Sequence, residues 1–251
     1  MSKSLKVSDD IKKKMRLAKA IAVDVDGTLT EENGEINLEA IDMLRIIKRK
    51  LGLKIVLASG NAYPVLMGLA RYIGVIDLVI AENGGVVGYG PEYKILGRRE
   101  IGLKAKELIK EKLSYILRES WQNPFRYVDF AFKLKEGYSW SEAIRLVEEL
   151  IKIHVPDAIS TFSGVAIHVK DKNVNKGLGL KIASQILNIN PNEFIAIGDS
   201  DVDVDMMIKA GLSIAVANAS KKAIEVADII TLKPYGEGFI EFSKLLLKIR
   251  Q

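Results

Sequence analysis

Two aspartates that flank a single residue are the first sign of chemistry in this chain. Residues 21–30 read IAVDVDGTLT, so an apolar run ends in Asp24 and Asp26, and Gly27 follows. Open α/β sheets hold their ligands at the carboxyl ends of parallel strands. A strand that ends in a solvated Asp-Gly turn accounts for one aspartate but not for the pair. The segment therefore predicts an attacking carboxylate beside a second acid, which is chemistry suited to phosphate esters.

Later segments add polar groups that suit a phosphate. The tripeptide Ser59-Gly60-Asn61 follows an apolar run and precedes an expected helix, so its hydroxyl and amides would form an anion cradle. Lys176 begins another expected helix, and Asp199 and Asp203 follow a further apolar strand. Because parallel strands end at one edge of the sheet, we expect these side chains to converge there.

The charges of these groups call for a cation. A carboxylate about 4 Å from a phosphate dianion is repelled by roughly 8 kcal/mol at an effective dielectric constant of about 20. A divalent ion held by aspartates, together with a lysine, would neutralise that repulsion, and oxygen ligands favour Mg²⁺ over zinc. Asp24 and Asp199 are the expected ligands, Asp203 lies within reach, and the backbone carbonyl of Asp26 is a further candidate.

The two paired acids would divide the work. We expect Asp24 to attack phosphorus and to form an aspartyl-phosphate. Asp26 would protonate the leaving oxygen and then deprotonate the water that cleaves the intermediate. Asp201 and Asp205 are interpreted as acids that complement a helix dipole. His168 has no partner histidine in a metal-ligand spacing, so we expect it to be structural or to line the cleft.

Composition excludes several classes of protein. The chain has 251 residues, 48% of them hydrophobic, and no cysteine, which excludes disulfides and thiolate metal sites. No apolar stretch is long enough for a membrane span or a signal segment, which predicts a cytoplasmic protein. The net charge is +5, but the basic clusters lie at helical spacing without interleaved aromatics, so no nucleic-acid partner is expected. Few glutamines favour a thermophilic source, and a homodimer is left as a possibility.

The order of expected elements predicts two domains. Strands and helices alternate up to residue 85 and again after residue 170, which is typical of a parallel sheet with right-handed crossovers. We therefore expect a discontinuous α/β core domain, Rossmann-like, over 1–85 and 171–251. Between them, strands that alternate polar and apolar residues indicate an α+β insert over 86–170. The insert is expected to contain a hairpin over 86–96, a helix over 102–118, a strand over 126–134, a helix over 140–153 and a hairpin over 158–169.

Taken together, the four motifs resemble the signature of the haloacid dehalogenase superfamily of phosphohydrolases. They are Asp24-Val25-Asp26-Gly27-Thr28, Ser59-Gly60-Asn61, Lys176 and Gly198-Asp199-Ser200-Asp201-Val202-Asp203. The insert resembles a Cof-type cap, and Ala81-Glu82-Asn83-Gly84-Gly85 is similar to the archaeal phosphoglycolate phosphatase branch. The resemblance implies that Asp24, Asp26, Asp199 and Asp203 bind or organise Mg²⁺, that Lys176 binds the phosphate, and that the small phosphorylated metabolite hydrolysed is 2-phosphoglycolate.

One departure and several alternatives remain open. Many Cof-type members carry Asn before the last motif aspartate, where this chain has Val202, so either that contact is dispensable here or Ser200 or Asn61 replaces it. The alternatives are a sugar-phosphate phosphatase, of Cof or sucrose-phosphate type, a phosphomutase, and a phosphate-binding regulatory protein. A small cavity with one or two donors would suit glycolate, whereas a larger polar cleft would suit a sugar. A pure binding protein has no use for an acid at Asp26.

Overall fold

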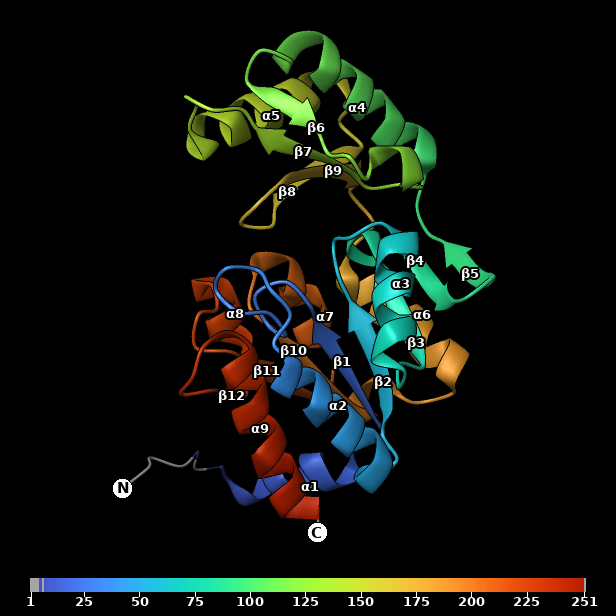
Figure 1. The fold of residues 1–251 in the computed structure, drawn as a ribbon. Helices are drawn as coiled ribbons and strands as arrows, with labels where there is room; N and C mark the ends of the chain where they lie inside the picture. Colours follow the sequence, from blue (N-terminus) through green and yellow to red (C-terminus); the bar gives the residue numbers. More distant parts are fainter. Residues whose placement is uncertain (1–4, 6, 251) are drawn as a thin grey trace.

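The structure is a computed structural model that describes residue 5 and residues 7–250. It consists of a larger α/β unit and a smaller unit above it, joined by two chain segments (Figure 1). Helix α1 (Asp9–Leu17) lies near the start of the chain, and residues 1–4, 6 and 251 lie outside the described part. None of the described helices is long and apolar enough to cross a membrane.

The larger unit is built on one sheet of eight strands in the described part of the chain. Their order is β12-β11-β10-β1-β2-β3-β4-β5. Six strands are parallel, and β1 lies in the middle between β10 and β2. All five residues of β1 are buried because helices cover both faces of the sheet. The bounds of the parallel strands are β1 Ala20–Asp24, β2 Lys54–Ala58, β3 Leu78–Ala81, β10 Phe194–Gly198, β11 Leu212–Ala215 and β12 Ile229–Ile230.

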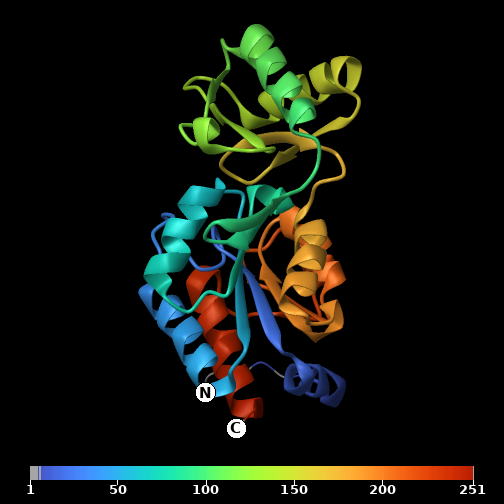
Figure 2. The same cartoon turned by 90° about the vertical axis from the view of Figure 1, so that its right-hand side faces the viewer.

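Helices form a layer on each face of this sheet (Figure 2). The odd-numbered residues of β1, such as Ile21, pack into one apolar cluster and the even-numbered ones, such as Ala22, into the other, as the two-residue period of a strand requires. On the first face lie α1, α2 (Leu38–Leu51), α3 (Tyr63–Ile73) and α9 (Tyr235–Arg250). On the second lie α6 (Lys176–Leu187), α7 (Val204–Lys209) and α8 (Lys221–Val226). The predicted α/β core with a parallel sheet is confirmed.

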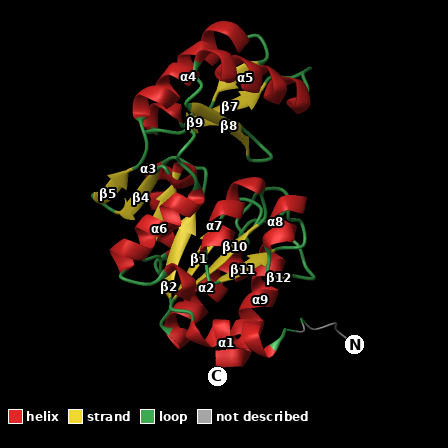
Figure 3. Ribbon diagram, turned by 180° about the vertical axis from the view of Figure 1, so that it is seen from behind, coloured by secondary structure: helices red, strands yellow, loops and turns green. Residues whose placement is uncertain are grey.

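The smaller unit, called the cap from here on, is an α+β layer pair. Its antiparallel sheet has the order β6-β7-β9-β8, and two helices cover the face that points away from the core (Figure 3). A separate apolar cluster fills the space between them. The elements are α4 (Arg99–Leu113), β6 (Leu117–Glu119), β7 (Phe130–Leu134), α5 (Trp140–His154), β8 (Ala158–Phe162) and β9 (Ile167–Asp171).

Two details differ from the sequence-based expectation. The hairpin of β4 (Val86–Tyr89) and β5 (Glu92–Ile95), predicted within the insert, instead extends the core sheet, because β4 pairs antiparallel with β3. The helix predicted over 102–118 ends at Leu113, and the short strand β6 follows it. Strand β4 reads VVGY and its first three residues are buried, so the alternation expected of the insert does not hold for it.

Polar contacts fix the cap to the core. Glu82, at the end of β3, accepts hydrogen bonds from the backbone amides of Tyr127, Val128 and Asp129 in the cap. In the two connecting segments, the backbone amide and Nε of Arg98 donate to Oδ2 of Asp171 at 3.1 and 2.9 Å. The cap therefore has a defined seat over the carboxyl edge of the core sheet. Short 3₁₀ turns complete the chain: η1 Glu82–Gly84, η2 Asn123–Phe125, η3 Pro191–Glu193 and η4 Asp201–Asp203.

Candidate active site

The predicted acids lie at the carboxyl edge of the core sheet, below the cap. Asp24 is the last residue of β1, and Asp199 follows directly after β10. The loop after β1 packs so tightly on Asp199 that a Cβ at Gly27 would lie 2.3 Å from Oδ2 of that residue. Gly27 also has a φ of +94°, which favours glycine. Glycine at position 27 is therefore required both by the turn and by the close approach of Asp199.

Asp24, Asp199 and Asp203, together with Lys176, form what we call the buried cluster. Carboxylate oxygens of the three aspartates lie within 4.8 Å of one another. Nζ of Lys176 donates to Oδ1 of Asp24 and to Oδ1 of Asp203, each at 2.5 Å. Oδ2 of Asp203 accepts hydrogen bonds from the backbone amide and hydroxyl of Ser200. Helix α6 and the turn η4 thus deliver side chains to the end of β1, as predicted.

The electrostatics of this cluster favour a cation. Burial and the charge of Asp203 raise the pKa of Asp199 to about 7 and raise the pKa of Asp24 well above its usual value. Burial disfavours the Lys176 ammonium, but the charges of Asp203 and Asp24 outweigh it and raise its pKa. Among the described residues, none donates a hydrogen bond to the buried Oδ2 of Asp24. One lysine does not neutralise three carboxylates, so the donor set fits a hard divalent ion.

Asp26 belongs to a different group of side chains. It is exposed, and its Oδ2 accepts hydrogen bonds from Oγ of Ser59 at 3.2 Å and from Nδ2 of Asn61 at 3.0 Å. Among the described acids, Asp26 is not one of the three whose oxygens gather within 4.8 Å. Its predicted role as a metal ligand stays a prediction for its backbone carbonyl. The Asp26 side chain is instead a carboxyl group that two donors, Ser59 and Asn61, hold in place.

Some of the donors of the predicted anion cradle already bond to other groups of the protein. The backbone amide of Asn61 donates to Oγ of Ser59 at 3.1 Å, and the next amide, of Ala62, donates to Oε1 of Gln122 in the cap at 2.8 Å. Gly60 and Asn61 nevertheless line a cavity with Asp24 and Asp26. The segment therefore bonds to Asp26 and to the cap, and Gly60 and Asn61 still line the cavity that contains the two acids.

Two cavities adjoin the site within the described residues. The smaller, of about 130 Å³, is lined by Asp24, Asp26 and Lys176 from the core and by cap residues that include Arg126 and Lys133. Pockets for drug-sized ligands usually span about 300 to 1,000 Å³, so this cavity suits a much smaller molecule. Both acids predicted to react with phosphate face it. We call it the catalytic cavity.

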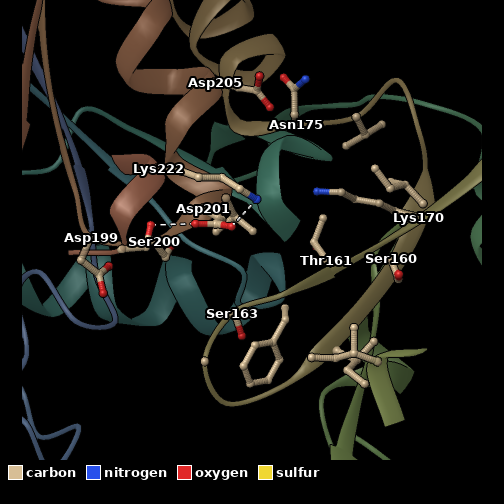
Figure 4. Close-up of a pocket in the computed structure, with 18 of the residues that line it drawn as sticks. Ser160, Thr161, Ser163, Lys170, Asn175, Asp199, Ser200, Asp201, Asp205 and Lys222 are labelled. Atoms are coloured by element: carbon tan, nitrogen blue, oxygen red, sulfur yellow. Dashed lines mark hydrogen bonds and ion pairs between the residues drawn. The ribbon is translucent and has the colours of Figure 1, made fainter. Parts of the chain in front are cut away.

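The larger cavity, of about 720 Å³, lies between the β8–β9 hairpin and the core (Figure 4). Hydroxyls of Ser160, Thr161 and Ser163 come from the cap, while Asp199 and Ser200 border it on the core side. Ser200 also lines the catalytic cavity, as do Ser163 and Val202, so the two spaces adjoin. The larger one contains neither Asp24 nor Asp26 in its lining.

The remaining predicted residues take largely structural places. Asp201 accepts a hydrogen bond from Ser220 and pairs with Lys222, each at 2.7 Å, and its interaction with a helix dipole stays a prediction. His168 is buried, its Nδ1 lies 3.0 Å from Oδ2 of Asp129, and it also lines the catalytic cavity. Burial lowers the pKa of His168, although Asp129 opposes the shift.

Ser200 and Asn61 were the candidates to replace the missing asparagine at Val202. Each already donates to an acid of the site: Ser200 Oγ to Asp203 at 2.7 Å, and Asn61 Nδ2 to Asp26 at 3.0 Å. Val202 itself lines both cavities. The departure from the Cof-type pattern therefore places an apolar side chain where the two spaces meet.

Sequence reasoning missed the residues that the cap contributes. Gln122, Arg126 and Lys133 line the catalytic cavity but stand outside any motif, about 100 residues beyond the two acids along the chain. Among 37 lysines and arginines nothing marks these two. Their proximity to Asp26 arises from how the cap sits on the core, and the sequence pattern carries no signal for that.

Comparisons with known proteins agree with this geometry. A model of the haloacid dehalogenase-like hydrolase family matches residues 21–138 and 132–242. The chain is 37% identical over 234 residues to a protein of Archaeoglobus fulgidus named phosphoglycolate phosphatase, covering 92% of this chain and 98% of that one. A Metallosphaera sedula protein of the same name is 37% identical, with 92% of this chain and 100% of the relative covered.

Solved structures give the same result for the fold. The crystal structure of Thermoplasma acidophilum 0175 superposes with a TM-score of 0.80 at 25% identity, covering 92% of this chain and 98% of that chain. A haloacid dehalogenase-like hydrolase from Bacteroides thetaiotaomicron gives 0.74 at 19% identity, with coverage of 92% and 99%. An acidic sheet edge beneath an inserted cap thus defines a hydrolase, and the chain belongs to the haloacid dehalogenase-like hydrolase family.

Proposed function

We propose that this enzyme is a Mg²⁺-dependent phosphatase that hydrolyses 2-phosphoglycolate to glycolate and phosphate through an aspartyl-phosphate on Asp24. The observation that carries the proposal is the catalytic cavity, where Asp24 and Asp26 face cationic cap residues in a space of about 130 Å³. The names of the archaeal relatives support the same substrate. The predicted homodimer and cytoplasmic location stay predictions.

The first half of the reaction transfers the phosphoryl group to the enzyme. A carboxylate oxygen of Asp24 attacks phosphorus, and the bond from phosphorus to the leaving oxygen breaks. Asp26 gives its proton to that oxygen, so glycolate leaves with a neutral hydroxyl. Mg²⁺ held by Asp24 and Asp199, with Asp203 beside them, would supply the positive charge that offsets repulsion between carboxylate and phosphate. Lys176 adds a second cation and orients Asp24.

The second half regenerates the enzyme. Asp26, now ionised, takes a proton from a water molecule, and the water oxygen attacks phosphorus. The bond between phosphorus and the Asp24 oxygen breaks, so phosphate leaves and both aspartates return to their initial states. Ser59 and Asn61 donate to one oxygen of Asp26 in the structure, which supports a fixed position for this acid throughout the cycle.

The cap side of the catalytic cavity suits an anionic substituent. Burial lowers the pKa of Lys133, while the charge of Asp26 opposes that shift, which identifies Lys133 as a partly desolvated cation near the acid. Nζ of Lys133 donates to the neutral backbone oxygen of Val165 at 2.9 Å, and no described acid forms an ion pair with it. We infer that Lys133 binds the carboxylate of phosphoglycolate, a charge-assisted contact that a sugar hydroxyl would use less well.

One observation favours a second candidate, a sugar-phosphate phosphatase. The larger cavity is lined by hydroxyls and adjoins the catalytic cavity through Ser163 and Ser200. A sugar whose phosphate reached Asp24 would have room there. We rank this second because the larger cavity does not include the two reacting acids and because the archaeal relatives are named for phosphoglycolate.

A substrate panel tests the proposal. Phosphoglycolate, hydroxyethyl phosphate and several hexose phosphates are compared by kcat/KM with excess Mg²⁺. We expect the highest value for phosphoglycolate, with hydroxyethyl phosphate at least about tenfold lower because it lacks the carboxylate. A maximum for a hexose phosphate would favour the second candidate. Absence of hydrolysis for every ester would overturn the phosphatase assignment.

A further inference from the structure

Gln122 is the cap side chain whose two amide atoms both bind the core. It precedes η2, and its Oε1 accepts from the backbone amide of Ala62 at 2.8 Å. Its Nε2 donates to Oδ1 of Asn61, also at 2.8 Å. Within the cap, Arg126 donates to the same Oε1 at 3.3 Å and is itself buried. Arg126 of the cap therefore fixes the Gln122 side chain, which in turn bonds to the core segment that contains Asn61.

Hydrogen-bond chemistry determines which atom of each side-chain amide donates and which accepts along these contacts. A backbone amide only donates, so the Gln122 atom facing Ala62 is its oxygen, and the Gln122 nitrogen faces Asn61. Asn61 must then present its oxygen to Gln122 and its nitrogen to Asp26. Nδ2 of Asn61 donates to Oδ2 of Asp26 at 3.0 Å and to Oγ of Ser59 at 2.9 Å. The Ala62 amide at one end and the Asp26 carboxylate at the other therefore require the same orientation of the two side-chain amides between them.

This arrangement leaves Asp26 with one oxygen held and one free. Ser59 and Asn61 both donate to Oδ2, and no described side chain donates to Oδ1. Oδ1 is therefore the oxygen of Asp26 that stays available to the leaving group. If Asn61 rotated, its amide oxygen would face the carboxylate instead, and the acid would lose a donor and gain repulsion.

We propose that Gln122 is a positioning residue for Asp26, so that seating of the cap sets the orientation of the acid that protonates the leaving group. The inference rests on the proposed function, in which Asp26 acts as that acid. Its consequence is that phosphoryl transfer is fast only when the cap is seated. An unseated cap would leave Asn61 free to rotate.

The test compares two esters that differ in their need for a proton. Hydroxyethyl phosphate releases an alkoxide that requires protonation, whereas p-nitrophenyl phosphate releases a stable phenolate. For Gln122→Leu, which keeps the size but loses both bonds, we expect kcat/KM to fall about 10- to 100-fold for the alkyl ester. It should stay within about threefold for the aryl ester, because acid catalysis contributes little there. Asp26→Asn should show the same preference with a larger alkyl effect.

A second variant separates positioning from cap attachment. Gln122→Glu keeps an oxygen for the Ala62 amide but has no donor for Asn61, and we expect the same selective loss. This variant also serves if the leucine variant fails to fold. Gln185→Leu, the same substitution at an exposed position of α6, is the matched control and should leave both esters unchanged.

Each outcome decides the matter. Equal losses for the two esters in both Gln122 variants would mean a purely structural contact and would overturn the inference. Unchanged values for the alkyl ester would overturn it as well. If the unmodified enzyme hydrolysed neither these two esters nor phosphoglycolate, the proposed function itself would fail, and this result differs from either outcome of the variants.

Discussion

The two halves of the site are held in different ways. The buried cluster of Asp24, Asp199, Asp203 and Lys176 comes from the core alone, and its lysine bonds are shielded from water. Asp26 is exposed, and its donor Asn61 depends on Gln122 of the cap. The core thus fixes the charges, while the cap contributes to the placement of the proton. The difference predicts that damage to the cluster removes activity altogether, whereas changes in the cap alter selectivity.

The largest effect is expected at Asp24. Asp24→Asn removes the nucleophile, so turnover should fall by at least about 10³-fold. The fold should persist, because the substitution keeps the shape of the side chain and removes a charge from a site where burial disfavours it. Initial rates and thermal unfolding are the measurements. Asp42→Asn, at an exposed position of α2, is the control. A rate for Asp24→Asn within tenfold of the rate of this control would refute a covalent role for Asp24.

Cation binding distinguishes the two halves directly. Mg²⁺ at about 100 times its dissociation constant should stabilise the protein by roughly 2.7 kcal/mol, which corresponds to a Tm increase of about 5 to 10 °C for a chain of this size. Excess chelator should abolish both the increase and the activity. Asp199→Asn should lose most of the Tm increase, and Asp26→Asn should keep it. An equal increase in both variants would mean that the cation binds elsewhere.

Selectivity should change when the cap cation is removed. For Lys133→Met we expect kcat/KM for phosphoglycolate to fall about 10- to 100-fold, since a hydrogen bond to a charged group contributes about 1.5 to 3 kcal/mol. Hydroxyethyl phosphate should change by less than about threefold. Lys135→Met, at an exposed cap position, is the matched control. A parallel decline for both esters would place Lys133 in phosphate binding instead.

The smallest effect concerns the segments that join cap and core. Burial opposes ionisation of Asp171, but its hydrogen bonds from Arg98 and Asn173 outweigh burial and lower its pKa from 3.8 to about 2. Because the folded pKa is the lower one, this group stabilises the fold fully above about pH 4, and the contribution is lost as the pH falls toward 2. It amounts to about 2 kcal/mol at neutral pH.

Urea unfolding at a series of pH values checks this. Relative to the unmodified protein, Asp171→Asn should be about 2 kcal/mol less stable near pH 7, and the deficit should shrink to roughly half near pH 3. A deficit that does not vary with pH would show that the substitution acts through shape and not through charge.

The core half of the site was predictable because each acidic motif directly follows an apolar strand. The apolar run before Asp24 and the one before Asp199 identify neighbouring buried strands, so their ends had to meet. The helix predicted from Lys176 begins at that residue, and Asn175 caps it, which explains how the lysine reaches Asp24. Local patterns of this kind contain the geometry, since a parallel sheet brings its carboxyl ends to one edge.

The cap half was not predictable in the same way. Gln122 bonds to Asn61, and Lys133 lines the catalytic cavity with Asp26, across an interface between two separately packed units, and no periodicity encodes that placement. The β4–β5 hairpin shows the same limit: a short antiparallel pair fits either sheet by pattern, and its pairing with β3 decides the matter. Sequence reasoning succeeded where one element fixes a residue and failed where two units must first dock.

The stereochemistry at phosphorus tests the central claim most directly. Hydrolysis of a phosphoglycolate made chiral at phosphorus with oxygen isotopes and one sulfur, in isotopically labelled water, gives a product whose configuration can be read by NMR. Two successive in-line displacements, first by Asp24 and then by water, predict retention of configuration. Inversion would mean that water attacks the substrate in a single step, and it would contradict a phosphoryl intermediate on Asp24.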